Sequence, residues 1–156
     1  MLSYKLVHLI QYHSDQLAAG LLRQVENAKR AESYRNVSAA ELKERVYEIY
    51  RHLGVWLVDK SEHDVEQRYM EIGARRVQQN VPLSELVWVI VLTKSNLLEY
   101  INDVAFPGRA ADGSERDELL QRLDKFFDCA IYAAVVGYER AAKTSTKPKK
   151  VMRKAS

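Results

Sequence analysis

The chain is poor in cysteine and in the residues that interrupt helices. Its 156 residues include one cysteine, Cys129, six glycines and three prolines. A single cysteine cannot form an internal disulfide or a multi-cysteine zinc site, so we expect it to fill core space in a protein of the reducing cytosol. Few glycines and prolines leave few turns. With 47% hydrophobic and 29% charged residues, this composition favours a single all-α domain over a disordered or loop-rich chain.

Neither a membrane span nor an export signal is predicted. Leu86–Leu92 is a run of seven consecutive apolar residues, but a transmembrane helix needs about 20, and the polar segment Thr93–Asn96 ends the run early. The first 16 residues alternate polar with apolar side chains and lack the pattern of a cleaved signal peptide. We therefore expect a cytoplasmic protein.

The net charge of +3 hides an asymmetry between the body and the carboxyl end. Residues 143–156 carry five lysines, one arginine and no acid, whereas the preceding 142 residues hold 18 basic and 21 acidic side chains. We therefore divide the chain into a helical domain, residues 1–142, and a basic, flexible tail, residues 143–156. Attraction to nucleic acid or an anionic surface would come from the tail, although it lacks the aromatic residues that stack on bases. Its basic residues include Lys147, Lys149, Lys150, Arg153 and Lys154.

Apolar residues recur every three or four positions almost throughout, which predicts helices. Ser38 and Glu41 form a capping-box pattern, and Pro82 suits a first helical turn, with Glu85 near the positive end of the helix dipole. One clear loop is expected at Phe106–Ser114. We expect about five main helices, beginning near the amino terminus and at residues 38, 61, 82 and 114, with the first ending near residue 30.

One buried charge is expected on the third of these helices. Arg76 follows Tyr69 by seven residues and falls on the core-facing side. A buried cation needs either a carboxylate partner or a polar ligand. We favour an ion pair that joins two central helices over a pocket for an anionic signal molecule.

Two segments carry a resemblance to a known family. RYMEIGARRVQQNVPLSELVWVIVLTKSNLLEYI and FFDCAIYAAVVGYERA resemble the amino-terminal domain of the RsbR and RsbRD type co-antagonists of bacterial stressosomes. This resemblance implies an all-helical, globin-like domain that lacks haem, dimerises and receives a signal that a STAS domain transmits. The residues that carry it are Tyr69, Gly73, Arg76, Pro82, Leu83, Glu85, Tyr132, Gly137, Tyr138 and Glu139.

The sequence contains few of the residues and motifs that cofactor binding or catalysis requires. His8, His13, His52 and His63 all lie in the first half of the chain, whereas globin-like proteins take their proximal haem ligand from a later helix. No HExxH metal motif, GxSxG nucleophile motif or glycine-rich phosphate loop occurs. We therefore predict no enzyme, no cofactor and no metal site.

Three functions follow from these observations. The preferred one is a non-enzymatic regulatory domain that forms a homodimer, senses a ligand or partner and acts through protein contact. Trp88, Val89 and Leu92 would supply its interface, and a partner chain would carry the output domain, since no STAS or kinase domain fits in 156 residues. The alternatives are a haem or other cofactor sensor of the same fold, and a binder of nucleic acid or anionic surfaces that works through the tail.

Overall fold

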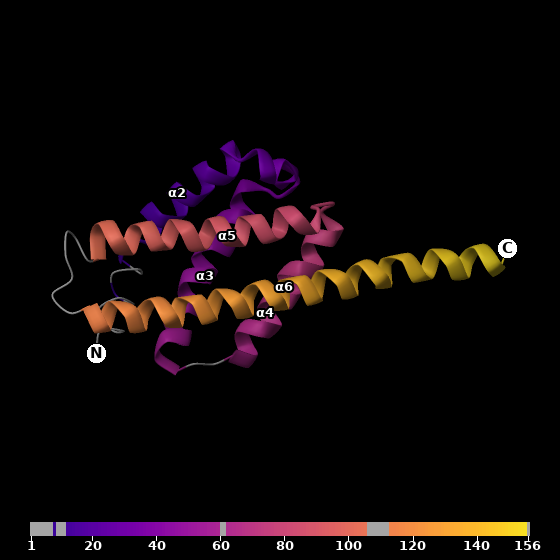
Figure 1. Cartoon of the computed structure of the whole chain (residues 1–156). Coiled ribbons are helices and arrows are strands. Elements are labelled where there is room, and N and C mark those ends of the chain that lie inside the picture. The colour runs from indigo at the N-terminus through magenta and orange to yellow at the C-terminus, as the bar shows by residue number, and fades with distance from the viewer. Residues whose placement is uncertain (1–7, 9–11, 60–61, 106–112, 156) are drawn as a thin grey trace.

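Nearly all of the backbone that the structure describes is helical. The computed structural model describes residue 8 and residues 12–59, 62–105 and 113–155, and no strand occurs among them (Figure 1). The all-α class is thus confirmed, and none of the described helices is long and apolar enough to cross a membrane. The elements are α2 (Ser14–Asn27), η1 (Lys29–Asn36), α3 (Ala39–Asp59), α4 (Glu62–Gln78), α5 (Leu83–Tyr100), η2 (Ile101–Ala105) and α6 (Gly113–Ala155).

The first predicted helix ends earlier than expected. Leu17, Leu21 and Val25 form its buried stripe, but α2 stops at Asn27 because Ala28 adopts an extended conformation. The chain then continues as the 3-10 segment η1, which is kinked at Ala31. This turn places Ala31, Tyr34 and Val37 in the core, and it creates the hollow described below.

The second helix begins where the capping-box pattern predicts. Ser38 Oγ accepts a hydrogen bond from the backbone N–H of Glu41 at 3.1 Å, and Ser38 O accepts one from the N–H of Leu42. The Glu41 side chain takes no part in this cap and instead reaches α4. Ser61, where the third helix was expected to begin, lies outside the described residues, as does most of the predicted loop, residues 106–112.

The apolar run of residues 86–92 is part of a helix. Pro82 is the N-cap of α5, one position before the first helical turn, and its carbonyl accepts hydrogen bonds from Glu85 N and Leu86 N. One side of α5 is buried in the core, including Leu86, Val89, Ile90, Thr93, Leu97 and Tyr100. The helix lies against α2 on one side and α6 on the other (Figure 1).

Helix α6 is the longest element and packs along α4. It buries Leu119, Leu123, Phe126, Phe127, Ala130, Ala133 and Ala134. Its last turns continue as a helix beyond the bundle to Ala155, so the basic stretch is an extension of α6 in the backbone (Figure 1). Side chains from residue 146 onward lie outside the described residues, and the flexibility of this tail stays a prediction.

Candidate functional site

A charged residue lies in the core at the end of α4. Arg76 is 2% exposed, and its Nη1 donates to Glu41 Oε2 at 2.8 Å and to Gln79 Oε1 at 2.7 Å. Arg75 Nη2 donates to the other oxygen of Glu41 at 2.9 Å. The ion pair predicted for Arg76 is therefore present, and it fastens the last turn of α4 to the first turn of α3. We call Arg75, Arg76, Glu41 and Gln79 the Arg76 cluster.

The cluster keeps Glu41 ionised. Hydrogen bonds from Arg75, and then from Gln79 and Arg76, lower the pKa of the Glu41 carboxyl to about 2, although burial alone would raise it. Because the carboxylate remains charged at neutral pH, Arg76 keeps a counterion inside the protein.

Tyr34 of η1 lies against the cluster. The Arg76 guanidinium carbon is 5.5 Å from the centre of the Tyr34 ring, which gives a cation–π contact. Burial raises the pKa of the Tyr34 hydroxyl, more than the nearby Arg76 lowers it. Next to it, Glu85 Oε1 accepts a hydrogen bond from the backbone N–H of Ser33 at 2.8 Å. Glu85 thus holds η1 against the first turn of α5.

A small internal cavity of about 30 Å³ extends from Arg76 toward Tyr69. Tyr69 is 1% exposed, and burial raises the pKa of its hydroxyl far above its usual value. Tyr69 Oη and Arg76 Nε are buried and have no hydrogen-bond partner among the described residues. We call this space the inner cavity. It has the volume of about one or two water molecules.

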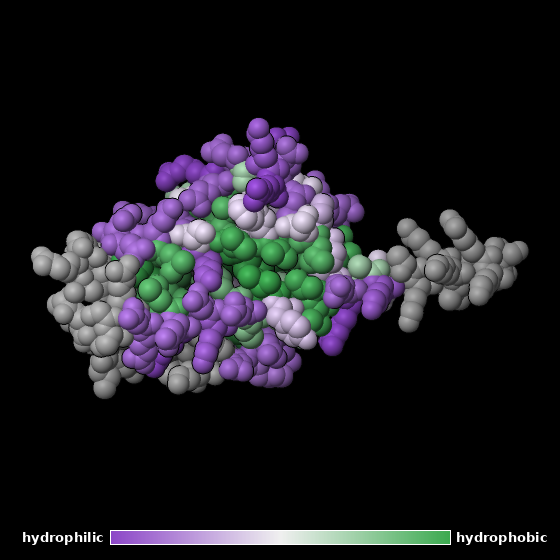
Figure 2. Space-filling model, in the orientation of Figure 1, coloured by the Kyte–Doolittle hydropathy of each residue, from purple (hydrophilic) through white to green (hydrophobic). Residues whose placement is uncertain are grey.

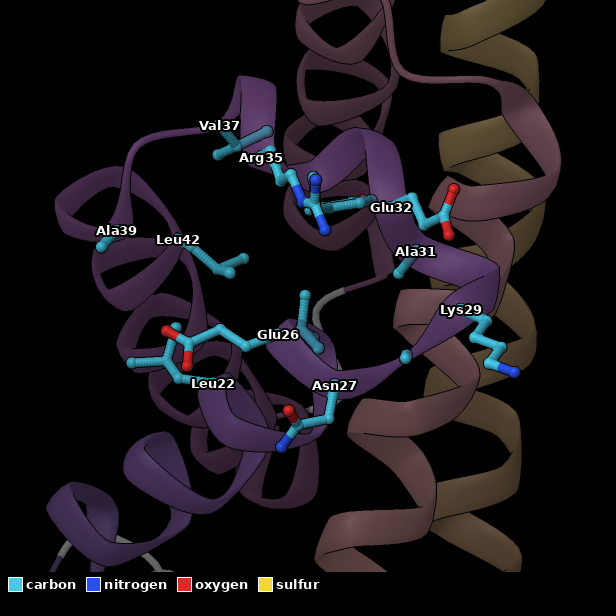
Figure 3. Close-up of a pocket in the computed structure, with 13 residues that line it drawn as sticks. Leu22, Glu26, Asn27, Lys29, Ala31, Glu32, Arg35, Val37, Ala39 and Leu42 are labelled. Atoms are coloured by element: carbon cyan, nitrogen blue, oxygen red, sulfur yellow. The ribbon is translucent and has the colours of Figure 1, made fainter.

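A larger hollow of about 330 Å³ opens between the end of α2, η1 and the start of α3 (Figure 3). We call it the outer pocket. Its walls are mainly apolar, and Glu26, Lys29, Glu32 and Arg35 line its edge. Tyr34 and Leu42 line both the outer pocket and the inner cavity. These two side chains are therefore shared walls between the surface and the Arg76 cluster.

A second surface feature, apart from the outer pocket, is an apolar area along α5 and α6. Val87, Val91 and Leu98 of α5, at helical spacing, and Ile131 and Val135 of α6 are all partly exposed. Lys94 Nζ and Asp124 Oδ1 form an ion pair of 2.7 Å that joins the two helices. Figure 2 shows the resulting apolar area along α5 and α6, bordered by hydrophilic residues. We call these five apolar residues the α5–α6 face.

The three residues predicted for an interface point elsewhere. Val89 is 6% exposed and packs in the core, so it offers little surface to a partner. Trp88 is covered by Arg30 of η1, whose guanidinium carbon is 4.6 Å from the ring centre. Leu92 lines a depression with residues of α2. None of the three belongs to the α5–α6 face.

The residues that carry the family resemblance come together only in part. Tyr69 and Arg76 line the same inner cavity. Tyr138 Oη donates to the carbonyl of Val81 at 2.7 Å, which fastens α6 to the α4–α5 connection. Tyr132 is 69% exposed and lies apart from these groups.

The sequence did not predict which residues, distant in the chain, lie next to Arg76 and around the outer pocket. Glu41 drew attention only as half of a local capping box, and Tyr34, Glu26 and Arg35 were not singled out. A carboxylate near the start of one predicted helix and a buried arginine near the end of another could have been paired by charge alone. The two walls of the outer pocket leave no such signal, because the pocket depends on the break between α2 and η1.

Histidine and cysteine side chains are common metal ligands in proteins. Within the described parts of the chain, no group of His, Cys, Asp or Glu side chains is arranged to hold a metal ion. His13 packs against the Tyr100 ring with centroids 5.5 Å apart. Burial raises the pKa of the Cys129 thiol, and the neighbouring Glu66 carboxylate raises it further, so this thiol is protonated at neutral pH.

Comparison with known families assigns the chain. The family model described as the RsbT co-antagonist protein rsbRD N-terminal domain matches residues 14–146. No curated protein and no solved structure matches the chain. The matched span includes the Arg76 cluster, both cavities and the α5–α6 face, and it covers most of the 156 residues. The chain therefore belongs to the family of RsbT co-antagonist rsbRD N-terminal domains, which are regulatory domains related to stressosome signalling.

Proposed function

We propose that this domain is a non-enzymatic regulator that works as a homodimer, with the α5–α6 face as the contact between two copies. The family consists of regulatory co-antagonist domains, whose function depends on contact with other proteins. In this chain the apolar, partly exposed face of two adjacent helices is the observation that carries the proposal.

The composition of the face fits a stable contact. Large contiguous apolar patches are uncommon on proteins that remain monomeric, and homodimer interfaces are more apolar than the average surface. Val87 and Val91 lie one helical turn apart on α5, and Ile131 and Val135 lie one turn apart on α6. Two copies that pack these helices together form a four-helix contact whose centre is aliphatic.

The geometry also provides a route from the core to a partner. Helix α6 contributes to the face, packs along α4, which carries Arg76, and continues beyond the bundle (Figure 1). A change in the packing of α4 therefore alters both the position of the face and the direction of the extended helix. The partner that carries the output domain reads this change from α6.

Sedimentation equilibrium of the full chain tests the proposal. The expected result is a reversible dimer in the micromolar range, because burying the aliphatic side chains of the face favours association. A single species with the mass of one chain, at every concentration measured, would exclude the homodimer.

A further inference from the structure

The outer pocket has the size and lining of a site for a small molecule. Its volume of about 330 Å³ falls at the lower end of the range for ligand pockets. Leu22, Val25, Val37 and Leu42 supply an apolar floor from α2, η1 and α3. Leu42 points into the hollow in Figure 3, between the parts of the wall that carry Glu26 and Arg35.

The charges at the edge are balanced and separated. Two acids, Glu26 and Glu32, and two bases, Lys29 and Arg35, line the pocket, so its edge carries no net charge. Glu26 and Arg35 come from opposite sides of the hollow, while Lys29 and Glu32 point away from its centre (Figure 3). Neither Glu26 nor Arg35 makes an ion pair in the described parts of the chain.

This arrangement selects a particular charge pattern in a ligand. A carboxylate matches the planar guanidinium of Arg35, and an ammonium group matches the Glu26 carboxylate on the opposite wall. The apolar floor between them accommodates an aliphatic group. Because the acids and bases at the edge balance, its net charge favours neither a simple anion nor a simple cation.

We propose that the outer pocket binds a small zwitterion with an aliphatic side chain, of the class of the branched-chain amino acids. Arg35 holds the carboxylate, Glu26 holds the ammonium group, and the side chain lies on Leu22, Val25, Val37 and Leu42. Because Tyr34 and Leu42 also line the inner cavity, an occupied pocket presses on the Arg76 cluster. The consequence for signalling rests on the proposed regulatory function, whereas the binding itself does not.

Isothermal titration calorimetry of the full chain with L-leucine is the first test. Saturable binding of one molecule per chain is expected. N-acetyl-L-leucine lacks the ammonium charge and 3-methylbutylamine lacks the carboxylate, so each should bind at least about tenfold more weakly. Absence of saturation with leucine and its close relatives overturns the proposal, and equal affinity for either analogue overturns the zwitterion.

Variants locate the site. Arg35→Ala and Glu26→Ala should each weaken leucine binding by about tenfold or more, and Ala39→Phe, which adds bulk at an exposed position of the pocket wall, should abolish it. Arg23→Ala and Glu44→Ala remove exposed charges outside the pocket and should leave binding unchanged. Binding that survives all three pocket variants overturns the assignment to this pocket.

The titration and the sedimentation experiment fail independently. If the chain is a monomer that binds leucine, the proposed dimer is wrong and the proposed ligand site stands. If the chain is a dimer that binds none of the three compounds, the proposed ligand site is wrong and the proposed regulatory function stands. Circular dichroism of each variant excludes loss of fold as the reason for lost binding.

Discussion

Gly73 of α4 and Gly137 of α6 lie where the backbones of the two helices meet. A Cβ atom on Gly73 would come within 2.1 Å of the carbonyl oxygen of Ala134, and one on Gly137 within 2.1 Å of the carbonyl oxygen of Met70. Both neighbours are backbone atoms, which cannot rotate away. The close packing of α4 on α6 therefore depends on these two glycines.

Adding one methyl group at this crossing should separate the helices. Gly73→Ala and Gly137→Ala should each lower the free energy of unfolding by about 2 kcal/mol or more, because the backbones must move apart. Gly20→Ala is the matched control, since its nearest neighbour would be the Asn96 side chain at 3.4 Å, and alanine favours the helix by up to about 1 kcal/mol. Urea unfolding of the three variants distinguishes the cases. Equal stabilities would mean that the helices do not approach so closely.

The buried arginine should matter more than its exposed neighbour. Arg76→Met keeps an apolar stem of similar length but removes a buried partner of Glu41, and it should cost about 3 kcal/mol. Arg75→Met should cost less than about 1 kcal/mol, because the Arg75 side chain is 57% exposed and solvent screens its charge. Thermal unfolding followed by circular dichroism provides both values. A larger loss from Arg75→Met would reverse our view of the cluster.

Acid should weaken the fold through Glu41. The pKa of this carboxyl is about 2 in the folded chain, against an ordinary value of 4.5, so its contribution to stability is complete above pH 4.5 and is lost as the pH falls toward 2. Glu41→Gln should be less stable than the natural chain at neutral pH, and the difference should shrink across this window. Urea unfolding over a pH series measures it. The exposed Glu44→Gln should show no such convergence, and a constant difference for Glu41→Gln would contradict the low pKa.

Three tyrosines differ in the environment of the hydroxyl group. The Tyr138 hydroxyl donates a hydrogen bond, the Tyr69 hydroxyl is buried without a partner among the described residues, and Tyr132 is exposed. Tyr138→Phe removes the hydrogen bond to Val81 O and should cost about 1 kcal/mol. Tyr69→Phe should change stability by less than about 0.5 kcal/mol or raise it, since the buried hydroxyl has no partner among the described residues. Tyr132→Phe, at an exposed position, serves as the control. If Tyr69→Phe proves the most damaging of the three, its hydroxyl has a partner in solution.

Features of the fold that depend on residues close together in the sequence could be predicted, whereas features that depend on contacts between distant helices could not. The capping pattern at Ser38, the start of α5 beside Pro82 and the stripe Leu17, Leu21 and Val25 depend on neighbours within a few residues. The break at Ala28 has no local cause as strong as a proline or glycine. It follows from the burial of Tyr34 and Val37 against distant helices, which a pattern within one segment does not encode.

The candidate site was predictable in kind but not in detail. Arg76 was expected to have a carboxylate partner, and it does, but the identity of Glu41 depends on how α3 and α4 pack. Val89 belongs to the apolar run of α5, yet only the packing of the other helices decides that it lines the inner cavity while Val87 and Val91 remain partly exposed. The same packing separates Glu26 from Arg35 across the outer pocket.

Dimerisation through the α5–α6 face is tested by comparing two glutamate substitutions in sedimentation equilibrium. Val91→Glu introduces a charge at the α5–α6 face, and Ala19→Glu introduces one at an exposed position of α2. With matching circular dichroism spectra for both variants, we expect Val91→Glu to be a monomer and Ala19→Glu to remain a dimer, because burying an uncompensated charge disfavours association. A Val91→Glu chain that dimerises as tightly as the natural one would contradict the assignment of this face.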